Sequence, residues 1–322
     1  MKKLIYTAVY FILFFHIGVA QTTNERALII SVGGARAAWG AGFAKAMYES
    51  GRDYRLYGGT SAGALIMGPI ALKKFDQLET LFQHITNRDV YNVNPLTKKG
   101  NFKFFKNIWR GLIGRNSLGE TKKLRLLLEQ MISEKEYQAL KSLKTELFCI
   151  TTNFGQQREV VKCSENESYS DMLDWIWASS TVPVIMKPLE KEGQIWVDGG
   201  LVDNTPVDHA LQRGVRHLDA ICLYPEKQLA MKKKLTLSNI SMQLLHTMIT
   251  SNEMQSSQIA QLLAKIEGNV QVHYYYMPQS DAAYLSNLFS FDHNVLAGGF
   301  DRGCQAFKKH PFLHQVFKSK QH

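Results

Sequence analysis

The stretch "RALIISVGG", Arg26 to Gly34, sets the fold class of this sequence. Its apolar residues follow one another without alternation, as in a strand that is buried on both faces of a parallel sheet. The two glycines at its end predict a tight turn. Residues 35–50 then place Trp39, Phe43 and Met47 at helical spacing, and Gly51 ends the pattern. The first folded unit is therefore predicted to be a strand, a turn and a helix.

The same order of elements repeats further along the chain. A short strand is expected at about Tyr54 to Tyr57, and the apolar run "ALIMGPIAL" after it is expected to be a helix. Alternating strands and helices with short links predict an α/β fold with a largely parallel central sheet. Further strands are expected at Glu146–Thr152, Glu159–Lys162, Gln194–Val197, Leu218–Tyr224 and Val270–Met277, with helical stretches at Thr121–Ile132, Ser170–Ser179 and about Leu237–Ile266.

The first twenty residues differ from the rest. Met1 to Lys3 is a basic start, Leu4 to Ala20 is almost wholly apolar, and Gly18 and Ala20 are small residues at signal-peptidase spacing. We therefore predict a signal peptide over residues 1–20, cleaved before Gln21, and an exported protein that is periplasmic or extracellular. An uncleaved anchor is the alternative, although this run is short of the ~20 residues that span a bilayer.

The remaining residues, 21–322, are expected to form a single domain, because no repeat, linker or composition break divides them. The formal net charge is +10, and removal of Lys2 and Lys3 leaves 10 − 2 = +8. For an exported protein this charge favours peripheral contact with an anionic membrane surface. Nucleic acid is not an expected partner, since no nucleic-acid module is recognisable.

The four cysteines suggest buried thiols more than a metal site. Cys149 and Cys222 lie in apolar, strand-like runs and are expected to be buried. Cys163 and Cys304 could pair in an oxidising compartment, but their spacing does not require it. No C-x-x-C or His/Cys cluster is present, and neither a metal nor a cofactor is predicted.

The stretch "YGGTSAGAL" contains Gly59, Ser61 and Gly63 at G-x-S-x-G spacing. Because it joins a predicted strand to a predicted helix, it has the context of a nucleophile elbow, with Ser61 on a strained turn. The helix N-terminus would favour negative charge developing there. A plain Gly/Ser turn is the alternative reading of the same pattern.

Two further segments carry candidate chemistry. Gly33-Gly34-Ala35-Arg36 lies between a strand and a helix, where consecutive N–H groups can form an oxyanion hole. A nucleotide-binding loop is disfavoured, since neither glycine-rich phosphate motif is present. In "WVDGGLVDNTPV" a strand ends at Asp198, followed by Gly199 and Gly200. Asp-Gly alone is most often turn chemistry, but beside a serine elbow Asp198 is a candidate base.

Together these segments resemble the patatin-like phospholipase family. That family joins a glycine-rich loop with a following basic residue, a G-x-S-x-G elbow and a later Asp-Gly-Gly, and all three occur here in that order. "WASSTVP" (Trp177 to Pro183) and the Asn204 and Pro206 that follow the aspartate also match, as do "LRLLLEQ" and "LFCITTNFGQQREVV". The likeness runs from about Arg26 to Tyr224, and loosely to Phe307. It implies a three-layer α/β/α fold.

The resemblance also implies a function. Ser61 would attack an acyl ester of a phospholipid or related lipid, and Asp198 would accept its proton in a Ser–Asp dyad that proceeds through an acyl-enzyme. Partial burial would raise the pKa of Asp198, which would make its carboxylate a better base. Gly33 and Gly34 would form the oxyanion hole. The supporting residues would be Ala35, Arg36, Gly59, Gly63, Gly199 and Gly200.

The sequence departs from the family pattern at several positions. Val32 and Ala37 stand where the family loop usually has glycines, and Asn153 stands where an aspartate is common. These changes put catalytic efficiency in question more than the fold. An acyltransferase that uses the same acyl-enzyme and a non-catalytic lipid-binding relative are therefore alternatives.

A Ser-Asp-His triad is the rival mechanism, because His209 and His217 follow Asp198 in the required chain order. Two features disfavour this triad. Ser61 follows only about two strands, whereas α/β-hydrolases with such a triad usually place the nucleophile after several strands. Both histidines are also expected at the surface.

One more segment suggests membrane contact. "NFKFFKNIWRGLIGRN", Asn101 to Asn116, places apolar side chains on one helical face and Lys103, Lys106 and Arg110 on the other, as in an interfacial helix. A helix packed on the core with a basic outer face is the alternative.

Overall fold

The computed structural model describes residues 26–97, 103, 117–226, 262, 270–309 and 315–318. The predicted signal peptide, the predicted interfacial helix at 101–116, apart from Lys103, and nearly all of the stretch predicted as helical at 237–266 lie outside these residues. Those three expectations stay predictions. No helix among the described residues is both long and apolar enough to span a bilayer.

The described strands form one nine-stranded sheet in the order β5-β6-β3-β2-β1-β7-β8-β9, and β4 also pairs with β3. The strands β3, β2, β1, β7 and β8 run parallel to one another. The pairings β3–β4, β3–β6, β5–β6 and β8–β9 are antiparallel. The strands are β1 (Arg26–Ile30), β2 (Leu56–Thr60), β3 (Glu146–Asn153), β4 (Arg158–Cys163), β5 (Leu189–Lys191), β6 (Gln194–Asp198), β7 (His217–Cys222), β8 (Gln271–Tyr276) and β9 (Gln315–Lys318).

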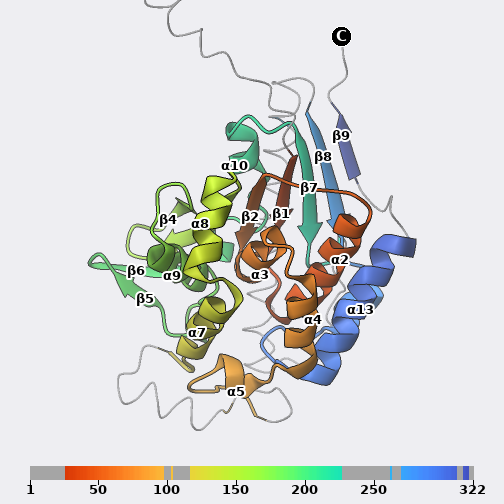
Figure 1. The fold of residues 1–322 in the computed structure, drawn as a ribbon. Helices are drawn as coiled ribbons and strands as arrows, with labels where there is room; N and C mark the ends of the chain where they lie inside the picture. Colours follow the sequence, from red (N-terminus) through yellow and green to blue (C-terminus); the bar gives the residue numbers. More distant parts are fainter. Residues whose placement is uncertain are drawn as a thin grey trace, which may run out of the picture.

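Helices flank this sheet, and α2, α3, α4 and α13 lie next to one another against its central strands (Figure 1). The predicted α/β class with a mostly parallel sheet is therefore confirmed. The helices are α2 (Ala37–Glu49), α3 (Ala62–Ala71), α4 (Phe75–His84), α5 (Asn87–Val90), α7 (Lys122–Met131), α8 (Glu134–Ser142), α9 (Tyr169–Ser179), α10 (Val207–Gln212), α12 (Gln279–Tyr284) and α13 (His293–Lys309), with 3₁₀ turns at Gly34–Arg36 and Gly199–Leu201.

Strand β1 is buried on both faces, as its unbroken apolar run predicts. Leu28 and Ile30 pack into the larger hydrophobic cluster, which includes the buried faces of α2, α3 and α4. Ala27 and Ile29 point to the opposite cluster, which includes the buried side chains of α10. Arg26 at the start of β1 is exposed, and the four apolar residues after it are buried because the chain covers them from both sides.

The sheet topology brings two distant segments together. Thr60, the last residue of β2, pairs with Ile150 of β3. Strand β6 runs antiparallel to the end of β3, so that its last residue, Asp198, pairs with the next residue, Thr151. The chain therefore leaves β2 at Ser61 and leaves β6 at Asp198 on neighbouring positions of the same central strand.

All four cysteines are free in the structure. Cys149 and Cys222 are buried at 0% exposure, which confirms the prediction for them. Cys163 Sγ accepts a hydrogen bond from Arg213, and Cys304 Sγ contacts the main-chain oxygen of Gly42.

Candidate active site

Ser61 occupies a strained turn between β2 and α3. Its backbone has φ 55° and ψ −118°, a conformation that costs a non-glycine residue on the order of 1–3 kcal/mol. The turn is held by the Ser61 N–H, which donates to Ser179 Oγ at 2.9 Å. Helix α3 begins at the next residue, so Ser61 lies at the positive end of its dipole. The predicted nucleophile-elbow geometry is present.

Gly63 allows α3 to approach β1 at this turn. A Cβ at Gly63 would lie 2.0 Å from the main-chain oxygen of Ile30, so no other residue fits without moving the helix. Gly59 lies in β2 directly beneath the turn, packed against Gly63. The two predicted supporting glycines thus bring strand and helix close together and fix the position of Ser61.

Asp198 contacts Ser61 directly. The Ser61 hydroxyl donates to Asp198 Oδ2 at 2.7 Å, and the other carboxylate oxygen accepts the Gly200 N–H at 2.7 Å. The main chain of Asp198 is fixed as well, because its N–H donates to Thr181 O and its carbonyl accepts from Thr152 Oγ1. Both residues of the predicted pair therefore meet, and Asp198 is held in one orientation.

Burial makes Asp198 an unusual carboxylic acid. Ser61 and Asp198 are 8% and 5% exposed. Loss of hydration raises the pKa of the Asp198 carboxyl from its ordinary 3.8 to about 7, while the bonds from Gly200 and Ser61 pull the pKa down by less. The direction of this shift matches the sequence prediction. A pKa close to neutrality suits a group that exchanges protons.

This raised pKa predicts a pH-dependent stability difference. Because the folded pKa lies above the unfolded one, the contribution of Asp198 to stability is complete below about 3.8 and is lost as pH rises through about 7. Asp198→Asn should therefore raise the free energy of unfolding by about 2 kcal/mol at pH 8 and by much less at pH 5. Urea unfolding at both pH values measures this. Exposed Asp301→Asn is the control, and an Asp198→Asn difference that is equal at both pH values would contradict the buried, titrating carboxyl.

The loop after β1 lies beside this pair. The N–H groups of Val32, Ala35 and Arg36 donate to main-chain carbonyls. In the described part of the chain, the N–H groups of Gly33 and Gly34 have no acceptor, and both glycines line the same pocket as Ser61. The two predicted oxyanion donors are therefore the N–H groups of this loop that are free to bind a ligand.

Arg36 braces this loop from within the protein. It is 8% exposed, and its guanidinium donates to the main-chain oxygens of Leu285, Leu223 and Ala282 at 3.2 to 3.3 Å. Burial lowers the pKa of Arg36 to about 10. These main-chain bonds hold the loop against the segments that contain Leu223, Ala282 and Leu285.

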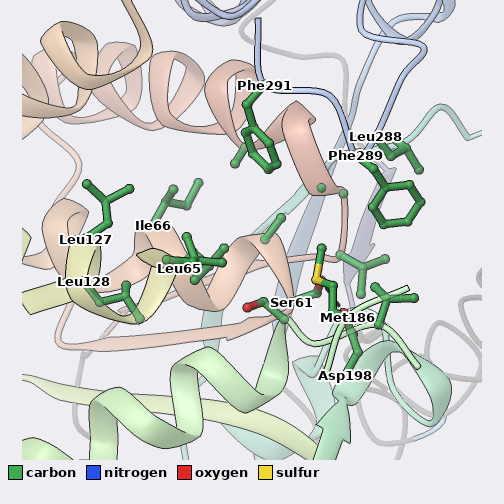
Figure 2. Close-up of a pocket in the computed structure, with 18 of the residues that line it drawn as sticks. Ser61, Leu65, Ile66, Leu127, Leu128, Met186, Asp198, Leu288, Phe289 and Phe291 are labelled. Carbon is green, nitrogen blue, oxygen red and sulfur yellow. Dashed lines mark hydrogen bonds between the residues drawn. The ribbon is translucent and has the colours of Figure 1, made fainter. Parts of the chain in front are cut away.

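Ser61 and Asp198 open into an apolar pocket whose volume, with its open mouth, is about 1130 Å³. Figure 2 shows Leu127 and Leu128 on one side of Ser61, and Leu288 and Phe289 on the other. The polar side chains that line it are Ser61, Ser180 and Asp198. The apolar ones include Leu65, Ile66, Leu78, Phe82, Leu124, Leu127, Leu128, Met131, Val182, Met186, Leu288, Phe289 and Phe291.

The two candidate triad histidines do not bond to Ser61. The imidazole of His209 bonds to the carboxylate of Glu159, and His217 begins strand β7, half-buried. His209 is also half-buried, so the expectation of surface histidines is only partly met. Glu159, Asp203 and His209 each place a ligand atom within 4.8 Å of one another and, within the described residues, could hold a metal ion.

Three residues depart from the family pattern, and each has a well-defined position in the structure. Val32 and Ala37 are buried and line the pocket, where larger side chains replace glycine without occupying the Gly33 and Gly34 N–H groups. Asn153 ends β3, and its side-chain oxygen accepts the Gln156 N–H in the following turn.

Two parts of the site were not predicted from the sequence. Ser179, which bonds to the N–H of Ser61, lies in the quoted "WASSTVP" motif and could have been proposed from it. The wall formed by Leu288, Phe289 and Phe291 had no signal in the sequence, because nothing there marks these residues as neighbours of Ser61.

Fold and site define a class: α/β proteins in which a serine on a strand-to-helix turn bonds to a buried aspartate below an apolar pocket. The chain belongs to the patatin-like phospholipase family, whose model matches residues 28–211.

Curated relatives share this part of the chain at low identity. The lysophospholipase NTE1 of Candida glabrata is 24% identical over 205 residues, which are 60% of this chain and 10% of that protein. The NTE1 of Pyricularia oryzae is 26% identical over 195 residues, which are 60% of this chain and 12% of that protein. The matched region thus spans about a tenth of the length of these relatives. Among solved structures, VipD from Legionella pneumophila aligns with a TM-score of 0.38 at 15% identity, covering 92% of this chain and 68% of that chain.

Proposed function

We propose that this chain is a serine-dependent lipid acyl hydrolase that cleaves carboxylic ester bonds through Ser61 and Asp198. The observation that carries the proposal is the 2.7 Å hydrogen bond from Ser61 to the buried Asp198, at the base of an apolar pocket. Membership of the patatin-like phospholipase family and the lysophospholipase name of the curated relatives support the same chemistry.

In the proposed reaction, Asp198 accepts the Ser61 proton as the Ser61 oxygen attacks the ester carbonyl. The N–H groups of Gly33 and Gly34 would stabilise the negative charge that develops on the carbonyl oxygen. Asp198 would then protonate the departing alcohol, and water would release the acyl group from Ser61. Because only the ionised carboxylate accepts a proton, kcat/KM should rise as the pH increases through about 7.

The pocket supports a lipid substrate. Apolar side chains from α3, α4 and α7 and the segment after α12 line it. Each methylene of an acyl chain that leaves water here gains about 0.8 kcal/mol. A long acyl chain therefore fits the chemistry of this wall better than a short polar acid does. We further propose that the substrate is reached outside the cytoplasm, at a membrane surface, as the predicted signal peptide implies.

Product analysis tests this function and separates its alternatives. Purified protein would be incubated with phosphatidylglycerol vesicles, lysophospholipid micelles and a triacylglycerol emulsion, with and without an added long-chain alcohol. Free fatty acid that is absent with Ser61→Ala supports the hydrolase. Acyl transfer to the added alcohol in preference to water would instead identify an acyltransferase. Lipid binding without any Ser61-dependent product would identify a lipid-binding relative.

Membrane contact has its own test. If residues 101–116 form an interfacial helix, reversing the charges of Lys103, Lys106 and Arg110 should weaken binding to anionic vesicles, since each basic residue near such a surface contributes about 1 kcal/mol. Binding to neutral vesicles and turnover of a soluble short-chain ester should change little. Vesicle sedimentation at low and high salt measures this, and equal losses on both vesicle types would refute the electrostatic contact.

A further inference from the structure

The segment after α12, Leu285 to Phe291, contacts the Gly33–Gly34 loop although it lies far beyond the family-matched residues 28–211. Leu288 O accepts the Ala35 N–H at 2.9 Å. The same main-chain oxygen of Leu288 lies so close to Gly34 that a Cβ added to Gly34 would be 2.3 Å from it. Arg36 Nε adds a bond to Leu285 O. The shape of the loop therefore depends on where this segment lies.

The same segment forms one wall of the pocket. The side chains of Leu288 and Phe289 are buried at 5% exposure and line the pocket on the side of Ser61 opposite Leu127 (Figure 2). Two hydrogen bonds from outside the segment hold its main chain in place. The Tyr91 hydroxyl donates to Phe289 O at 2.9 Å, and the Asn87 side chain accepts the Phe291 N–H. Leu288 thus touches the pocket through its side chain and the loop through its main chain.

We propose that Leu288 is a positioning residue that couples the filling of the pocket to the geometry of the Gly33–Gly34 loop. This inference rests on the proposed function. A group that packs against the Leu288 side chain presses the segment toward the loop, because a close-packed wall transmits small displacements. The Ala35 bond then holds the two free N–H groups in the position where charge develops. Acyl-chain length accordingly acts on the chemical step and not only on binding.

Kinetics with p-nitrophenyl esters from acetate to decanoate test this coupling. Leu288→Ala should lower kcat for the decanoate ester about tenfold and leave kcat for the acetate ester within about twofold, since misplacement of the loop slows the chemical step. The acetyl group has a single methyl beyond its carbonyl carbon and therefore offers little surface to pack against the side chain. Leu127→Ala, on the opposite wall, is the matched control and should raise KM for decanoate without lowering kcat. Leu288→Val, which removes one methylene, should show a smaller change of the same kind.

Hydrogen–deuterium exchange measures the same coupling in a protein that is not turning over an ester. Free decanoate should slow deuterium uptake at residues 32–37 in the wild type and in Leu127→Ala, and should slow it less in Leu288→Val. If no ester is turned over in a Ser61-dependent manner, the proposed function fails, and exchange alone decides the role of Leu288. Two results overturn the inference: a Leu288→Ala effect confined to KM, as in Leu127→Ala, or equal protection by decanoate in the wild type and Leu288→Val.

Discussion

Ser61→Ala is expected to lower kcat for ester hydrolysis by at least about 10³-fold, with the fold intact. The hydroxyl of Ser61 donates the hydrogen bond to Asp198, and the Ser61 main chain is held independently by Ser179. Alanine therefore removes the proposed nucleophile and little else. Initial rates on a soluble ester, with circular dichroism to confirm folding, measure the effect.

Asp198→Asn should cause a loss of similar size, because asparagine cannot accept the Ser61 proton. The double variant should be no slower than about the worse single variant, since the two residues act as a unit. Losses that multiply would mean that Ser61 and Asp198 contribute independently. Glu159→Gln is a matched control, because it removes a carboxylate of β4 that pairs with His209 of α10 and not with Ser61.

Gly34→Ala is expected to have the second large effect. Gly34 has φ +56°, and a Cβ there would lie 2.3 Å from Leu288 O. The loop must therefore shift, and the proposed oxyanion donors shift with it. We expect kcat to fall about 10²-fold, the loss typical of a missing oxyanion donor.

Gly51→Ala is the control for Gly34→Ala. Gly51 also has a positive φ, +87°, but nothing lies within 4 Å of the position of a Cβ. Both variants carry backbone strain of about 1–2 kcal/mol, and thermal unfolding reports it. Only Gly34→Ala should also lose kcat. A loss of stability in both, with unchanged kcat in both, would remove the Gly33–Gly34 loop from the chemistry.

The sequence predicted those elements whose pattern is local. The run ending at Ile30 is β1, and the G-x-S-x-G turn has the strained backbone expected for Ser61. The second strand was placed too early, at Tyr54, whereas β2 begins at Leu56 and continues through two glycines to Thr60. Glycine has low strand propensity, so the sequence did not reveal that the sheet continues to the elbow.

The other missed features depend on contacts between distant residues. Arg36 bonds to Leu285, which is 249 positions away, and no local pattern links the two. The helix α13, His293 to Lys309, and the edge strands β5 and β9 were also not predicted. Strands of three or four residues are too short to show alternation. The pair Ser61 and Asp198 was found because each follows a strand in a recognisable motif.

Covalent labelling of the folded protein tests the central claim most directly. A fluorophosphonate reacts with a serine only where a neighbouring base and oxyanion donors activate it. Intact-mass analysis after labelling should show a single adduct, and peptide mapping should place it on Ser61. Ser61→Ala should take no label, and Asp198→Asn should label far more slowly. A folded wild-type protein that takes no label, or one labelled at another serine, would contradict the account.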